Sequence, residues 1–485
     1  MSISSAISNA VSGLTAVSRG TELVSSNIAN ALTPGYARRE LELASRPSER
    51  GGGVNVAGVD RILNAGLLAD SRLTQADVGA SGTTSAFHVA MEQLFGTGQE
   101  ASSLGQMLTA FESALTSAAA RPDNETQLDN VLTAASGLAD KLNTMSESIQ
   151  AERTAADSAI SKDVARLNTA LEQVALFNKQ IVSLTAQGKD ASSLVDTRQA
   201  VIDGIADIVP LKEVPRENGR IALFTVGGAI LLDGTEPASI SFESAGNITP
   251  QMSLANGALA RLTFNGKELS AGQMSMFSGG TISANFAIRD EVAPEYQQQI
   301  DGFAREIYDR LADPAIDPSL NAGGPGIFTD AQGALDPADE TGFAGRISVT
   351  TLIDPAAGGD LWRIRAGVNA ASSGDSGDSG LLGRLSSALS TTRLPASGNL
   401  TQQSRSLQTL AAHLSSFAST NRIQAEAAAL QDSAHQNSLK TALLADGVDT
   451  DKEMESLLAL ERAYSANAKV FQTANDMLDA ILRLT

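Results

Sequence analysis

Residue types that carry most enzyme and metal chemistry are scarce in this chain of 485 residues. It has no cysteine and three histidines, His88, His413 and His435. The absence of cysteine excludes disulfides, thiolate metal sites, iron–sulfur clusters and cysteine nucleophiles. His88 lies in a helical stretch beside Phe87 and Met91, which favours a role in packing. A histidine-based metal site or catalytic triad is therefore not expected.

Carboxylates are plentiful, with 55 aspartates and glutamates, and a pair of them could act as the acid and base of a glycoside hydrolase. A sugar platform of aromatic rings is missing, however, because aromatic residues make up 4% of the chain and Trp362 is its one tryptophan. Asp375 and Asp378 lie in Ser-Gly-Asp repeats at 372–380. Their spacing matches no complete calcium motif and indicates a flexible loop. We expect no enzyme activity, no cofactor and no metal.

Phosphate-binding and hydrolase motifs are also missing. The sequence contains no P-loop, H-E-x-x-H, G-x-S-x-G or EF-hand pattern. Gly51-Gly52-Gly53 could cradle a phosphate, but it leads into Val54-Asn55-Val56 rather than into a helix. It therefore predicts the turn of a β-hairpin.

The charge balance narrows the partners further. Acidic residues outnumber the 35 basic ones and give a net charge of −20, which argues against binding to nucleic acid or to an anionic membrane. No apolar run reaches the roughly 18 residues of a membrane span. Residues 1–37 hold only two charges, Arg19 and Glu22, and lack the basic start of a cleavable signal peptide. We expect no membrane insertion, and any export would follow a route that reads no ordinary secretion signal.

Both ends of the chain carry heptad patterns. Near the N-terminus, apolar residues recur in steps of four and three, which predicts a coiled-coil helix that ends at Thr33-Pro34-Gly35-Tyr36. The residues of this first pattern include Ile3, Ile7, Ala10, Leu14, Val17, Thr21, Val24, Ile28 and Ala31. Those of the second are Leu457, Tyr464, Phe471 and Leu478, with Leu460, Ala474 and Ile481 between them. Thr450 and Glu453 predict a capping box at the start of the last helix.

The remaining faces of the first helix carry Ser, Asn and Thr rather than Lys and Glu, which indicates that other helices surround it. We therefore expect a helix pair at the two chain ends, with an assembly interface on it. The residues predicted for that interface are Ile3, Ile7, Leu14, Val17, Val24, Ile28, Leu457, Tyr464, Phe471, Leu478 and Ile481.

The interior alternates between helix and strand. A helix is predicted from Glu125 to Ala186, a stretch with no proline and one glycine, and others at 291–311 and 407–444. Between 210 and 280, Asn-Gly and Asp-Gly dipeptides separate short alternating runs, which predicts hairpins. The predicted strands are Ile221–Val226, Ala260–Phe264, Ile347–Leu352 and Leu361–Ala366.

These patterns predict an elongated, multidomain α+β fold. The terminal heptad helices form a coiled-coil domain from 1–45 with 446–485, and β-rich modules are inserted into a long helical bundle. The predicted bundle comprises 46–209 with 286–312 and 396–445. A β-rich domain at 210–285 and a loop and β-rich insertion at 313–395 complete the chain.

The segment 26–38, Ser-Asn-Ile-Ala-Asn-Ala-Leu-Thr-Pro-Gly-Tyr-Ala-Arg, resembles a motif shared by rod, hook and hook-associated proteins of the bacterial flagellum. The segment 447–478 is similar to the C-terminal signature of the same group. The residues that match the first motif are Asn27, Asn30, Thr33, Pro34, Gly35 and Tyr36.

Interior segments resemble one member of that group, the hook-associated protein 1 family. They are Gly53–Val56 with Val59–Arg61, Leu194-Val195-Asp196-Thr197-Arg198-Gln199, and Arg289-Asp290-Glu291 followed by Tyr296. Val195 and Thr197 depart from the family pattern, and residues 211–285 and 313–395 match no motif of it.

The resemblance implies a structural component of the bacterial flagellum, secreted by the flagellar type III apparatus to the cell exterior. Its members form the hook–filament junction as an adaptor between hook and filament. The implied partners are further copies in a ring at the hook tip, the hook protein, hook-associated protein 3, and an export chaperone on the C-terminal helix. Two alternatives stay open: a distal rod or hook protein, and an exported glycan or peptidoglycan hydrolase on an axial scaffold.

Overall fold

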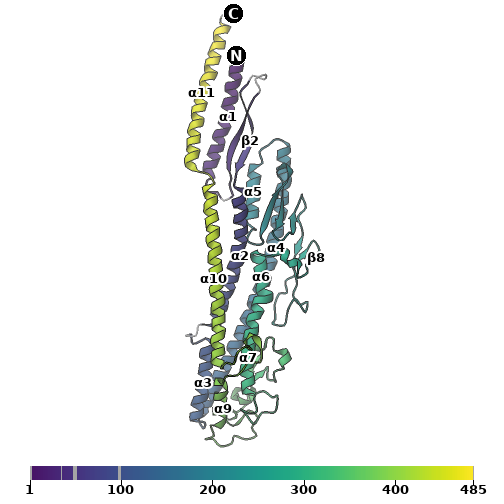
Figure 1. Ribbon diagram of the computed structural model, residues 1–485, viewed down its shortest axis with the longest axis vertical. Coiled ribbons are helices and arrows are strands. Elements are labelled where there is room, and N and C mark those ends of the chain that lie inside the picture. Colours follow the sequence, from purple (N-terminus) through teal and green to yellow (C-terminus); the bar gives the residue numbers. More distant parts are fainter. Residues whose placement is uncertain (1–2, 34, 47–51, 97–99, 484–485) are drawn as a thin grey trace.

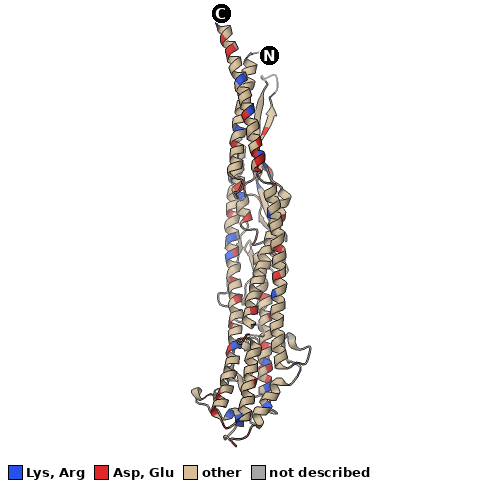
Figure 2. Ribbon diagram, turned by 90° about the vertical axis from the view of Figure 1, so that its left-hand side faces the viewer, with Lys and Arg blue, Asp and Glu red and all other residues tan. Residues whose placement is uncertain are grey.

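The protein is long and narrow, with its N- and C-terminal ends side by side at one tip (Figure 1). The structure, a computed structural model, describes residues 3–33, 35–46, 52–96 and 100–483. The predictions that involve Pro34 and Gly51 therefore lie outside the described residues. Acidic and basic side chains are interspersed along the whole length of the molecule (Figure 2).

Helices make up most of the described chain. A single helix, α4, runs without interruption for 62 residues, which confirms the helix predicted from Glu125 to Ala186. The helices are α1 (Ile3–Ala29), α2 (Ala65–Phe95), α3 (Leu104–Ala120), α4 (Glu125–Ala186), α5 (Ser192–Asp203), α6 (Gly280–Ala287), α7 (Ala293–Leu311), α8 (Arg363–Ala366), α9 (Gly380–Ser390), α10 (Leu407–Ala445) and α11 (Thr450–Leu482).

Among the residues described, four small antiparallel sheets accompany the helices. Two have two strands, β1 with β2 and β9 with β10, and two have three, in the orders β3-β4-β5 and β6-β7-β8. The strands are β1 (Arg38–Ser45), β2 (Val54–Ile62), β3 (Leu211–Pro215), β4 (Ile221–Thr225), β5 (Ile230–Leu232), β6 (Ile240–Ser241), β7 (Thr263–Phe264), β8 (Lys267–Glu268), β9 (Phe328–Asp330) and β10 (Ile347–Val349).

Two hydrophobic cores share α4 along its length. In the lower core, α4 residues between Leu128 and Ala156 pack with α3, α7, α9 and the start of α10. In the upper core, residues from Ile160 to Ala175 pack with α5, α6 and the β3–β8 module. Because each core uses a different stretch of one helix, α4 holds the two cores in line. We call residues 65–445, which contain both cores, the rod.

Several predicted elements differ from the structure. The strand expected at Leu361–Ala366 is wrong: the segment is helical, because the N–H groups of Arg365 and Ala366 donate to the carbonyl of Trp362 rather than to a neighbouring strand. The strands expected at Ala260–Phe264 and Ile347–Leu352 form only as the shorter β7 and β10. The helix expected from residue 291 begins at Gly280 instead, since α6 passes through a π-helical turn into α7.

Above the rod lies a smaller unit, which we call the terminal domain: α1, the β1–β2 hairpin and α11 (Figure 1). The two helices run antiparallel, because Gly13 lies against Asn467 whereas Gly20 lies against Leu460. β1 pairs with β2 along its whole length, so the domain boundary predicted at residue 45 falls inside this hairpin. Gly53 in the turn has a φ of 99°, which favours glycine.

Candidate assembly surface and the joint beneath it

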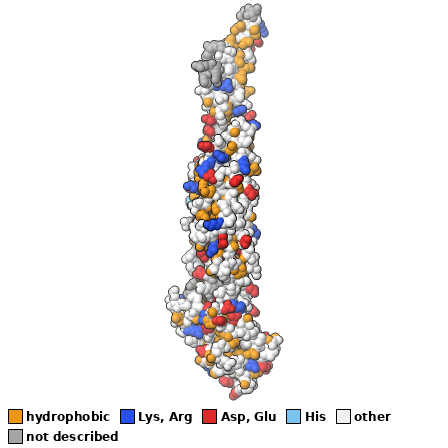
Figure 3. Space-filling model, turned by 90° about the vertical axis from the view of Figure 1, so that its right-hand side faces the viewer, with side chains coloured by type: hydrophobic (Ala, Val, Ile, Leu, Met, Phe, Trp, Pro, Cys, Tyr) orange, Lys and Arg blue, Asp and Glu red, His pale blue; other side chains and the backbone are white. Residues whose placement is uncertain are grey.

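Helix α11 contacts the described chain along only one narrow face. Glu453 and Ala474 are its only described residues that are buried. Large apolar side chains on its other faces are 38–63% exposed, and hydrophobic side chains follow this projecting end of the molecule in Figure 3. These exposed side chains, which we call the α11 apolar face, are Met454, Leu458, Tyr464, Val470, Met477, Leu478, Ile481 and Leu482.

The contact between α1 and α11 is built on small residues. A Cβ atom at Gly13 would lie 2.8 Å from the Asn467 side chain, and one at Gly20 would lie 3.1 Å from Leu460. Both distances are shorter than ordinary van der Waals contact, so the two glycines let the helices approach closely. The close approach leaves little room for large apolar side chains between the helices.

The residues predicted for the interface are therefore distributed over several environments. Val17 and Val24 are buried inside the terminal domain. Tyr464, Leu478 and Ile481 are exposed and belong to the α11 apolar face. The remaining predicted residues are partly buried, namely Ile3, Ile7, Leu14, Ile28, Leu457 and Phe471.

Below the α1–α11 pair, one buried side chain joins three elements of the terminal domain. Asn27 is 1% exposed, and its Nδ2 donates to the carbonyl of Arg39 at 2.9 Å and to Oε2 of Glu453 at 3.0 Å. Its Oδ1 accepts from the Tyr36 hydroxyl at 2.8 Å and from the Arg39 N–H at 3.0 Å. All four hydrogen-bonding positions of the amide are used, so α1, β1 and α11 are fixed relative to one another.

Glu453 is the acidic member of this arrangement. Its side chain is 1% exposed, and the Arg38 guanidinium donates to Oε1 at 2.7 Å. This hydrogen bond raises the pKa of Arg38. The predicted capping box is wrong, because the N-cap of α11 is Asp449, whose carboxylate accepts from the N–H groups of Asp451 and Lys452. Glu453 is thereby free to turn toward α1 and β1.

A second charged contact ties the terminal domain to the rod. The carboxylate of Asp196 on α5 accepts from Arg39 of β1 at 2.5 Å and from Arg61 of β2 at 2.5 Å and 2.9 Å. Arg61 also donates to Gln199 of α5 at 3.0 Å. The Arg39 guanidinium lies 4.9 Å from the centre of the Tyr36 ring, a cation–π distance.

The other residues of the predicted motif lie around this joint. Asn30 donates to the carbonyl of Ser26 at 2.9 Å, and Thr33 donates to Asn30 at 3.2 Å, so both close the end of α1. Gly35 has a φ of 79° and lies against Ala200 of α5. Four of the segments singled out in the sequence, at 26–38, 53–61, 194–199 and 447–478, thus meet at the joint between rod and terminal domain.

Metal-binding residue types are not grouped in the part of the chain that the structure describes. Among those residues, no three side chains of histidine, aspartate or glutamate are grouped as metal ligands. His88 lies in the lower part of the molecule, where its Nδ1 is 3.0 Å from the Tyr296 hydroxyl, and burial lowers its pKa. None of the helices described combines the length and apolar character of a membrane span.

Comparison with known protein families places the chain among flagellar axial proteins. Residues 89–313 match the flagellar hook-associated protein FlgK helical domain, which covers most of the rod. Residues 7–36 match the flagella basal body rod protein family, and residues 441–484 match the flagellar basal body rod FlgEFG protein C-terminal family. The two terminal matches cover α1 and α11, the helices that carry the joint and the α11 apolar face.

Individual relatives are similar to the chain over different lengths. Flagellar hook-associated protein 1 of Bacillus subtilis is 23% identical over 506 aligned residues, which cover 97% of this chain and 96% of the relative. The protein of the same name from Salmonella typhimurium is 27% identical over 293 residues, 55% of this chain. By these matches the chain is similar to members of the flagellar hook-associated protein 1 (FlgK) family.

Two matches have limited extent. The alignment with the Salmonella typhimurium relative spans 53% of that protein's length. Among solved structures, the flagellar hook junction protein FlgK from Burkholderia pseudomallei is 16% identical and superposes with a TM-score of 0.45, over 54% of this chain and 46% of that one.

Proposed function

We propose that this protein is a structural axial component of the bacterial flagellum and that it forms the hook–filament junction as an adaptor between hook and filament. The α11 apolar face carries the proposal. Eight large apolar side chains on one helix stay 38–63% exposed, although the monomer buries two complete cores elsewhere. Exposed apolar surface of this kind is typical of interfaces between proteins. The role is structural rather than catalytic.

The terminal domain is the assembly unit of this proposal. Neighbouring copies in a ring at the hook tip would cover the α11 apolar face and extend the α1–α11 pair into coiled-coil packing. The eleven predicted interface residues share this role: those inside the pair hold the two helices together, and the exposed ones, such as Tyr464 and Ile481, meet the neighbouring copies. Hook protein would lie on one side of the ring and hook-associated protein 3 on the other. Before export, a chaperone would hold α11, and the exported protein would be extracellular.

The domain division that fits this role keeps the predicted units with one adjustment. The hairpin moves to the terminal domain, which then comprises residues 1–62 and 446–485. The helical bundle, the β-rich domain at 210–285 and the insertion at 313–395 keep their predicted ranges otherwise. The two inserted modules are parts of the rod and lie below the terminal domain (Figure 1).

A distal rod or hook protein is the second candidate, because the two ends of the chain match rod-protein families. Position along the appendage separates the two candidates. Cells that lack the gene should carry hooks without filaments and shed flagellin into the medium, and gold-labelled antibody against the restored protein should mark the end of the hook. A label at the base of the hook, or cells without hooks, would instead support the second candidate.

A further inference from the structure

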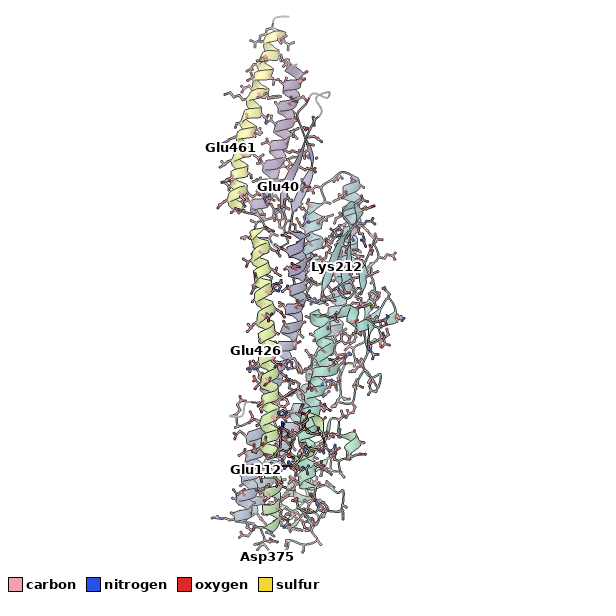
Figure 4. The ribbon with its side chains drawn as sticks, viewed as in Figure 1. Glu40, Glu112, Lys212, Asp375, Glu426 and Glu461 are labelled. Atoms are coloured by element: carbon pink, nitrogen blue, oxygen red, sulfur yellow. The ribbon has the colours of Figure 1, made fainter. Side chains whose placement is uncertain are left out.

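Besides the short chain link from β2 to α2 and the hydrogen bond from Asn64 to Asp446, two contacts between the terminal domain and the rod differ in kind. One is the contact of the hairpin with α5, where two arginines bind the carboxylate of Asp196. The other is α10, which rises from the lower core along α2 and continues through residues 446–449 into α11 (Figure 4). The stability of the joint depends on how firmly each support is held.

The two halves of α10 are held very differently. Five residues from Leu407 to Ala418 are buried in the lower core. Between residues 419 and 445, which we call the upper half of α10, no described residue belongs to either hydrophobic core, and Gln436 alone is buried. Figure 4 shows Glu426 on this half, where α10 runs beside α2 and apart from α4. Ala418 is therefore the last fully buried apolar residue of α10.

Above Ala418, α10 contacts α2 through polar side chains. The Gln436 amide lies 3.3 Å from the Ser71 hydroxyl, and Nδ1 of His435 lies 3.5 Å from the Thr74 hydroxyl, both at the outer limit of hydrogen bonding. Lower down, Arg422 pairs with Glu92 at 2.5 Å, with both side chains 20–25% exposed. Water competes for partly exposed pairs, so contacts of this kind contribute little to stability.

The seat of α10 on α2 is also incompletely packed. A cavity of about 400 Å³ lies beneath its upper end, lined by the loop after α1, the end of β2, α2, α5 and the α10–α11 connection. Two residues that line it, Arg72 and Gln436, each have a buried polar atom, Nη2 and Oε1, without a hydrogen-bond partner among the described residues. Leu32 and Leu444 at the cavity are 93% and 71% exposed.

Unpaired buried polar atoms and exposed leucines make this position of α10 on α2 less stable. A shifted position in which the polar atoms are paired and the leucines are covered is more stable. Residues 446–449 between α10 and α11 are not helical and include Gly447, so the chain there can absorb a change of angle. The contact between the hairpin and α5 is more rigid, because an arginine from each strand of the hairpin binds the Asp196 carboxylate.

We infer that the upper half of α10 is a compliant strut, which shifts on α2 while the hairpin–α5 contact acts as a pivot, so that the terminal domain tilts on the rod. The inference rests on the proposed function, because a subunit between two unlike neighbours must fit its assembly domain to both. The tilt moves α10 into the cavity and gives Oε1 of Gln436 a hydrogen-bond donor.

Hydrogen exchange of the purified full-length protein tests the strut. Amides at 425–440 should exchange at least about a hundredfold faster than those at 410–418 of the same helix, since the upper half opens without unfolding the core. Gln436→Leu replaces the unpaired amide with an apolar side chain of similar size and should slow the exchange of 425–440 about tenfold. Gln424→Leu makes the same change at an exposed position of α10 and should leave the exchange unchanged. Uniform protection along α10, or an equal effect of both variants, would overturn the inference.

A distance measurement tests the tilt itself. The chain has no cysteine, so spin labels at Ser465→Cys on α11 and Glu172→Cys on α4 report one distance between terminal domain and rod. The distance distribution should be broad in the parent protein and narrower with Gln436→Leu but not with Gln424→Leu. Equal widths in all three would contradict a tilt governed by α10. Neither measurement involves the hook, so failure here is distinct from failure of the proposed function, which rests on position in the cell.

Discussion

Replacement of Asn27 by alanine tests how this side chain holds the joint together. The substitution removes an amide that is 1% exposed and leaves four partner groups without it. Glu453 keeps the hydrogen bond from Arg38 but loses its contact with α1, and the Tyr36 hydroxyl loses its 2.8 Å partner. The Arg39 N–H and carbonyl lose their partners in α1 as well.

The cost follows from the kinds of bond lost. Three bonds join neutral groups and contribute roughly 1 kcal/mol each, and the bond to the Glu453 carboxylate contributes about 1.5–3 kcal/mol. Tyr36 and Arg39 are partly exposed, so water replaces part of this loss. We expect the joint to lose about 3–4 kcal/mol, which corresponds to a roughly 200- to 1,000-fold increase in local opening.

Hydrogen exchange on peptides from the hairpin and the first turns of α11 measures that opening. Asn30→Ala is the matched control, because Asn30 lies one turn further along the chain and its side chain bonds, among the described residues, to the nearby Ser26 and Thr33. It should raise exchange at the joint less than about tenfold, while the core helices stay protected in both variants. Equal exchange in the Asn27 and Asn30 variants would refute the assignment of Asn27 as the centre of the joint.

Three further predictions concern the rod. Leu171→Asp buries a charge in the upper core and should lower the free energy of unfolding by more than about 4 kcal/mol, whereas Leu176→Asp, at a side chain 52% exposed on the same helix, should change it by less than about 0.5 kcal/mol in urea unfolding. Burial raises the pKa of Asp301 to about 6, so its contribution to stability is full below its unfolded pKa and is lost as pH rises through 6. Between pH 8 and pH 5 the protein should therefore gain about 1.4 kcal/mol from this group, and Asp301→Asn should remove that gain from the pH profile of the melting temperature. Arg289→Met leaves the fully buried Asp157 without its ionic partner at 2.7 Å and should cost roughly 3–5 kcal/mol by urea unfolding; a loss below about 1 kcal/mol would show that the pair does not hold the π-helical turn between α6 and α7 to α4.

Local patterns in the sequence were sufficient to predict the long helices. The bounds of α4 follow from the absence of proline and from regular apolar spacing, and those of α10 agree with the predicted 407–444 to within a residue. Asn218-Gly219 and Asn265-Gly266 do connect paired strands, because both asparagines adopt the positive φ that tight turns require.

The contact face of the terminal helices could not be predicted from apolar spacing alone. Apolar periodicity selected Leu460, which does face α1, but it also selected the exposed Tyr464 and Leu478. It did not select Asn467, which lies against Gly13. Helix spacing depends on the smallest residues at the contact, and a search for large apolar side chains overlooks them. Glycines at 13 and 20, one heptad apart, were the available signal.

The joint depends on partners far apart in the sequence. Asn27 and Glu453 are separated by 426 positions, and Arg39 and Asp196 by 157. The motifs identified these segments, but the residue types within them did not indicate which residues would pair. Glu453 was expected to cap its own helix, and only the fold brings it to Asn27.

The most direct test of the account is whether the α11 apolar face is needed for assembly and not for folding. Val470→Asp and Met477→Asp change side chains 49% and 54% exposed, so the purified variants should melt with the parent protein. Leu352→Asp, at a side chain 43% exposed in the insertion at 313–395, is the matched control. In cells that lack the native gene, the control should restore filaments, and both α11 variants should leave bare hooks and shed flagellin. Normal filaments with either α11 variant would contradict the account.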